Sequence, residues 1–110
     1  MFGFGKKKRA VTCPFPVLFE VLDEDLNLGI CCDIFFTLDD KKHSMGAYGD
    51  NGNTYKNVKY YLDETEVDSL DELKELLLHG CPLKDYQGQV TVTECDGFYP
   101  DGMKQFASYL

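Results

Sequence analysis

The chain has 110 residues, 44% hydrophobic and 14% aromatic, which is enough for one domain with an ordinary core. Its net charge is −8 at pH 7, but four of its eleven basic residues lie together at positions 6–9. The remainder holds 7 basic and 19 acidic residues, a net charge of −12. A field of this sign repels nucleic acid and anionic membranes and attracts cationic partners. We expect residues 1–10 to form a mobile basic arm and residues 11–110 to form one domain.

The cysteines indicate a reducing compartment. They are odd in number and none is separated from another by the two-residue gap of a redox or zinc motif: Cys13, Cys31, Cys32, Cys81 and Cys95. Two prolines, Pro14 and Pro16, interrupt the apolar run that follows the basic residues, so neither a signal peptide nor a membrane span is expected. The sequence therefore predicts a cytoplasmic protein with free thiols.

Alternating hydrophobicity predicts a four-stranded antiparallel meander over about residues 16–62. Its first strand is inferred from Val17, Phe19 and Val21, and its second covers residues 30–38. A turn centred on Asp40-Lys41 would pair Phe36 with Met45 and Ile34 with Ala47. A turn at Asn51-Gly52, which suits the positive φ angles of a type I′ hairpin, would pair Met45 with Val58 and His43 with Tyr60.

A helix is predicted over about residues 70–79. Ser69 and Glu72 form a capping box, Leu70, Leu73, Leu76 and Leu77 form an apolar stripe, and Gly80 ends the helix. We expect this helix on the apolar face of the sheet, followed by a fifth strand at about residues 88–94 and a short C-terminal helix. The predicted fold class is α+β.

The second face of the predicted sheet is the first candidate site. It carries an aromatic patch beside one carboxylate: Asp33, Phe35, Tyr48, Tyr55 and Tyr61. Exposed aromatic patches bordered by polar groups are typical of interfaces, and tyrosine combines a large ring with a polar group. The patch could instead be a solvated face stabilised by cross-strand pairs, or the contact of a homodimer.

A dense acidic stretch is the second candidate site. Positions 63–75 hold one lysine and seven acidic residues: Asp63, Glu64, Glu66, Asp68, Asp71, Glu72 and Glu75. Such a stretch could dock a basic protein such as a toxin or a nuclease, because complementary charge speeds association. Acidic residues also stabilise the start of a helix, which explains part of the same pattern.

Chemistry-bearing residues are few. His79 and Cys81 could form a thiol site if their side chains converged, but the spacing supplies no metal-ligand set, phosphate loop or catalytic motif. The sequence therefore predicts neither catalysis nor a metal or other cofactor.

These observations predict a small acidic binding protein that occludes a basic protein partner. In size, acidity and lack of a catalytic constellation it is similar to bacterial immunity proteins and small inhibitors, although no motif carries this likeness. Two alternatives stay open. One is a small enzyme or ligand-binding domain that uses Cys81 and His79; the other is a homo-oligomeric structural module that uses the tyrosine-rich face.

Overall fold

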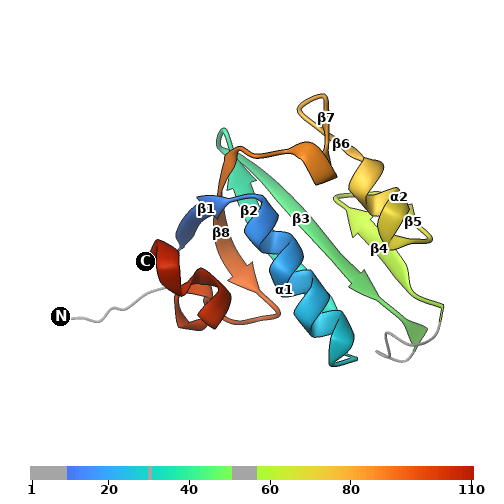
Figure 1. Cartoon of the computed structure of the whole chain (residues 1–110), viewed down its shortest axis with the longest axis horizontal. Coiled ribbons are helices and arrows are strands. Elements are labelled where there is room, and N and C mark those ends of the chain that lie inside the picture. Colours follow the sequence, from blue (N-terminus) through green and yellow to red (C-terminus); the bar gives the residue numbers. More distant parts are fainter. Residues whose placement is uncertain (1–9, 30, 51–56) are drawn as a thin grey trace.

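The computed structural model describes residues 10–29, 31–50 and 57–110. Six antiparallel strands form one sheet in the order β1-β8-β2-β3-β4-β5, and a long helix, α1, crosses one face of it (Figure 1). This arrangement confirms the α+β class. The sheet strands are β1 (Val11–Pro14), β2 (Cys32–Leu38), β3 (Lys41–Tyr48), β4 (Lys59–Leu62), β5 (Thr65–Val67) and β8 (Gln89–Cys95).

The remaining elements are short, apart from the long helix. The α-helices are α1 (Pro16–Asn27) and α2 (Leu70–Glu75), and a small hairpin joins β6 (Leu77–Leu78) to β7 (Cys81–Pro82). Three 3-10 helices follow α2 in the chain: η2 (Leu83–Asp85), η3 (Pro100–Gly102) and η4 (Lys104–Tyr109).

The predicted first strand is wrong, because the segment forms helix α1. Its buried residues recur with helical spacing: Val17, Leu18, Val21, Leu22 and Asp25. Pro16 lies in the first turn, where its missing N–H is harmless, and Gly29 adopts φ 76° just after the helix. The meander exists but begins at β2 and ends at β5, and β8 takes the place next to β2.

The predicted hairpin registers are shifted by an even number of residues. Asp39 and Asp40 have φ angles of 51° and 64° and form the turn between β2 and β3, which pairs Phe36 with His43. Met45 pairs with Leu62 rather than with Val58. Since side chains alternate with a period of two, both shifts preserve the predicted faces. The Asn51-Gly52 turn lies outside the described residues.

Strand β8 confirms the predicted fifth strand and contains a bulge. Phe35 pairs with Glu94 and Phe36 with Val92, so Thr93 is the extra residue of β8. The Thr93 hydroxyl donates a hydrogen bond of 3.2 Å to the carbonyl of Phe35. Because the bulge reverses the alternation, Val92 and Cys95 are both buried and Glu94 lies on the same face as Phe35.

The predicted capping box forms, but helix α2 is shorter than predicted. The Ser69 hydroxyl accepts a hydrogen bond of 3.1 Å from the backbone N–H of Glu72, whose carboxylate accepts from the N–H of Asp68. The helix ends before Leu76, because His79 and Gly80, with φ angles of 55° and 78°, form the tight turn of the β6–β7 hairpin. Helix α1, not α2, covers most of the apolar sheet face (Figure 1).

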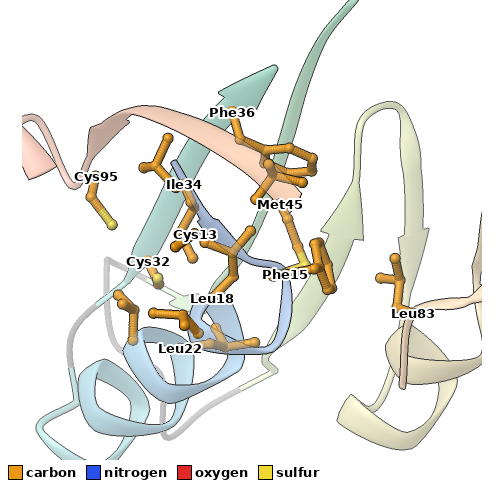
Figure 2. Close-up of a cluster of buried hydrophobic side chains, with 14 of the residues drawn as sticks. Cys13, Phe15, Leu18, Leu22, Cys32, Ile34, Phe36, Met45, Leu83 and Cys95 are labelled. Atoms are coloured by element: carbon orange, nitrogen blue, oxygen red, sulfur yellow. The ribbon is translucent and has the colours of Figure 1, made fainter. Parts of the chain in front are cut away.

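The core lies between α1 and the sheet. Leu18 and Leu22 from the helix meet Ile34 and Met45 from the strands, all of them fully buried (Figure 2). The predicted short C-terminal helix is confirmed as the 3-10 helix η4, which packs against β1 and α1 through the buried Phe106. In the described part of the chain, no helix has the length and apolar character needed to cross a membrane.

Candidate functional site

The sheet face opposite α1, which we call the outer face, carries the predicted aromatic patch. Phe35 is 42% exposed, Tyr48 is 41% exposed, and Tyr61 is half-buried. Tyr55 lies outside the described residues. The C-terminal 3-10 helix packs on the α1 side, so it leaves these aromatic rings accessible.

Tyr61 and Asp33 are joined across the middle strand of this face. Both residues pair with Gly46 of β3, and the Tyr61 hydroxyl donates a hydrogen bond to the Asp33 carboxylate. A Cβ atom at Gly46 would lie 1.9 Å from the backbone oxygen of Cys32 and 3.0 Å from the Tyr61 hydroxyl. Glycine is therefore required by the close approach of the β2 backbone, and a Cβ atom would also crowd the Tyr61 hydroxyl. Burial and the bond to Asp33 raise the pKa of Tyr61.

Tyr48 is fixed in a similar way at the β5 edge. Its hydroxyl donates a hydrogen bond to the Glu66 carboxylate, which raises the pKa of Tyr48. The rings of Tyr48 and Tyr61 are tilted by 53° with centroids 6.5 Å apart. Beside them, Lys59 forms an ion pair of 2.5 Å with Asp68. The two hydroxyl–carboxylate bonds thus hold aromatic rings and negative charges together on one face.

A pocket of about 370 Å³ adjoins the exposed ring of Phe35. Its lining combines aromatic, hydroxyl and charged side chains: Phe35, Phe36, Thr37, Lys42, His43, Thr93 and Glu94. The ring of His43 stacks on Phe36 with centroids 5.4 Å apart, and its Nδ1 lies 2.8 Å from the Asp63 carboxylate. His43 therefore lies on the same face of the sheet as the buried Phe36.

Most of the predicted acidic docking stretch has local partners. Glu66 and Asp68 are bound as described above, Glu72 completes the capping box, and Glu75 forms an ion pair of 2.7 Å with Lys84. Asp63 binds His43 and the N–H of Ser44. Glu64 and Asp71 are exposed. These roles explain why the residues are acidic without a partner protein, and docking by this stretch stays a prediction.

The predicted thiol pair points to separate partners. His79 Nδ1 lies 3.7 Å from the Asp39 carboxylate, whereas the Cys81 thiol contacts the carbonyl of Pro82 at 3.5 Å. Among the described residues, no hydrogen bond joins the two side chains. The positive φ of His79 reflects its place in the hairpin turn.

A group of three side chains that sequence reasoning missed lies at the end of the core. Asp25 of α1, Cys32 of β2 and Asp96 after β8 place one potential ligand atom each within 4.8 Å of one another. Burial and the neighbouring Asp25 raise the pKa of Asp96 to about 7. Burial also raises the pKa of Cys32, and the two carboxylates raise it further.

The outer face and this buried group meet at Asp33. Its backbone N–H donates a hydrogen bond of 2.8 Å to Asp96 Oδ1, while its side chain binds Tyr61. No protein-family model, curated protein or solved structure matches the chain.

Proposed function

We propose that this protein binds a basic protein through the outer face of its sheet and acts by occluding the surface that it covers, without catalysis. The observation that carries the proposal is an accessible sheet face on which exposed aromatic rings alternate with carboxylates. Phe35 and Tyr48 are the exposed rings, and Asp33, Glu66 and Glu94 supply the charge. Aromatic residues at the centre of an interface contribute most of its binding energy.

The aromatic rings are held in place before a partner arrives. The bonds from Tyr48 to Glu66 and from Tyr61 to Asp33 restrict both side chains, and both belong to strands of a continuous sheet. Ordering a side chain at an interface costs about 0.5–1.5 kcal/mol, so side chains that are already ordered favour binding.

The charge of the chain supports a basic partner. Residues after Arg9 carry a net charge of −12. Among the described residues, Lys42 and Lys59 are the lysines on the outer face, against the three carboxylates named above. A basic groove would complement this face, and the attraction would speed encounter at low salt. The same charge opposes stacking of two copies through this face. Five free cysteines are consistent with a protein that works in the reducing cytoplasm.

Affinity capture from the native lysate tests the proposal. The full chain and two variants are used as bait: Phe35→Ala on the outer face and Leu77→Ala on the exposed β6 hairpin, where the leucine is 62% exposed. We expect one basic protein that elutes with salt, is retained by Leu77→Ala and is lost with Phe35→Ala. Capture of only further copies of this chain would contradict the proposal. Equal retention of the basic protein by Phe35→Ala and Leu77→Ala would also contradict it.

A further inference from the structure

The carboxylate of Asp25 is buried without a compensating charge. The residue is 8% exposed, and its Oδ2 atom has no hydrogen-bond partner among the described residues. No described lysine, arginine or histidine forms an ion pair with it. Removing a carboxylate from water in this way is strongly unfavourable unless a cation or a proton neutralises it.

The neighbours of Asp25 form a ligand set for a cation. One donor atom each from Asp25, Cys32 and Asp96 lies within 4.8 Å of the other two. In a tetrahedral zinc site, bonds of about 2.0–2.3 Å place neighbouring ligand atoms about 3.5 Å apart. A decrease of about 1 Å in the distances between these ligand atoms therefore suffices for zinc binding. Asp96 lies in a turn with Gly97, and their φ angles are 54° and 83°.

We propose that Asp25, Cys32 and Asp96 form a binding site for a divalent metal ion of the zinc class. A thiolate with two carboxylates suits zinc, cobalt or cadmium, whereas calcium and magnesium require more oxygen ligands. Asp96 is half-buried, which leaves a fourth position for water on the solvent side. Binding releases the proton of the Cys32 thiol to solvent.

The site has an outer hydrogen bond that orients one ligand. The backbone N–H of Asp33 donates to Asp96 Oδ1, and the Asp96 N–H donates to the Asp33 carbonyl at 2.8 Å. Such bonds fix the direction of a ligating carboxylate. Metal binding would therefore order the turn after β8 beside the outer face.

Cobalt binding tests the proposal on the full chain at neutral pH. Co²⁺ is added to the reduced protein, and we expect a thiolate-to-cobalt charge-transfer band with the visible absorption of tetrahedral cobalt. Zinc should displace the cobalt and raise the melting temperature by an amount that grows with the logarithm of its concentration. Asp25→Asn should weaken affinity at least about 100-fold, more than loss of an outer hydrogen bond does.

Matched variants separate loss of ligand from loss of fold. Asp23→Asn removes an exposed carboxylate of the same helix, and Cys13→Ala removes a buried thiol outside the group; both should bind metal like the parent chain. Asp25→Asn removes a buried charge and should melt no lower than the metal-free parent. Absence of the charge-transfer band, or equal metal binding by Asp25→Asn, would overturn the proposal. Stabilisation at lower pH but not by zinc would also overturn it, because Asp25 and Asp96 would then share a proton instead of binding a metal ion.

Discussion

Tyr61 on β4 and Asp33 on β2 form a hydrogen bond over the strand that separates them. Gly46 of β3 has no side chain, which leaves room for the Tyr61 hydroxyl. This bond orders the centre of the outer face. It is also connected to Asp96, because the backbone N–H of Asp33 donates a hydrogen bond to the Asp96 carboxylate.

Substitution of Gly46 should destabilise the fold. In Gly46→Ala the new Cβ would overlap the Cys32 carbonyl oxygen, at 1.9 Å, so β2 and β3 must move apart. We expect a loss of about 3 kcal/mol in the free energy of unfolding, measured with urea. Gly102→Ala is the control, because its Cβ meets no atom within 4 Å, and it should change stability by less than about 0.5 kcal/mol. Equal effects of the two variants would contradict the close packing at Gly46.

The Tyr61–Asp33 bond should appear as an energetic coupling. Tyr61→Phe removes the donor and should cost about 1 kcal/mol of unfolding free energy. In a double-mutant cycle with Asp33→Ala, which removes the acceptor, measured by urea unfolding, the two losses should be less than additive by a similar amount. Additive losses would show that the two side chains do not interact in solution.

Leu22 tests whether the segment after Pro16 is a helix or a strand. In helix α1 the side chain is fully buried, whereas the alternation predicted from sequence would place it on the outer face. Leu22→Ala should therefore cost about 3 kcal/mol in urea unfolding. The control, Leu28→Ala, removes a side chain that is 63% exposed and should cost less than about 0.5 kcal/mol. A small effect at Leu22 would favour the strand.

Cys13 should make stability fall at alkaline pH. Burial, with a smaller contribution from Glu20, raises the pKa of Cys13 from 9.0 to about 11. The unfolded chain loses this proton first, so the native state binds more protons between these pH values. The contribution of Cys13 to the free energy of unfolding is therefore full below pH 9 and falls as the pH rises toward 11. Urea unfolding of the parent and of Cys13→Ala should show this fall as a pH-dependent difference; a constant difference would contradict it.

Local patterns predicted the parts of the fold that depend on neighbouring residues. The capping box at Ser69 and Glu72, the two-faced alternation of β2 and β3, and the position of β8 are confirmed. The faces were right even where registers were wrong, because the turn at Asp39-Asp40 shifts pairing by two residues.

The segment after Pro16 forms a helix although its alternation predicts a strand, because its apolar residues fit both periods. Val17 and Val21 belong to both the alternating and the helical pattern. Pro16 in the first turn and Gly29 after the last are the signals that favour the helix.

The buried group could not be found from spacing along the chain. Asp25, Cys32 and Asp96 come from a helix, a strand and a turn, and they meet because β8 pairs with β2 and α1 crosses the same strand. No local pattern encodes that pairing.

The affinity of the captured basic protein for outer-face variants tests whether the outer face binds a basic partner. Dissociation constants would be measured by calorimetry for the parent chain, Tyr48→Ala and Leu77→Ala, each at low and at high salt. We predict at least about tenfold weaker binding for Tyr48→Ala, unchanged binding for Leu77→Ala, and weaker binding of the parent at high salt. Unchanged affinity of Tyr48→Ala, or binding that is insensitive to salt, would contradict binding of a basic protein through the outer face.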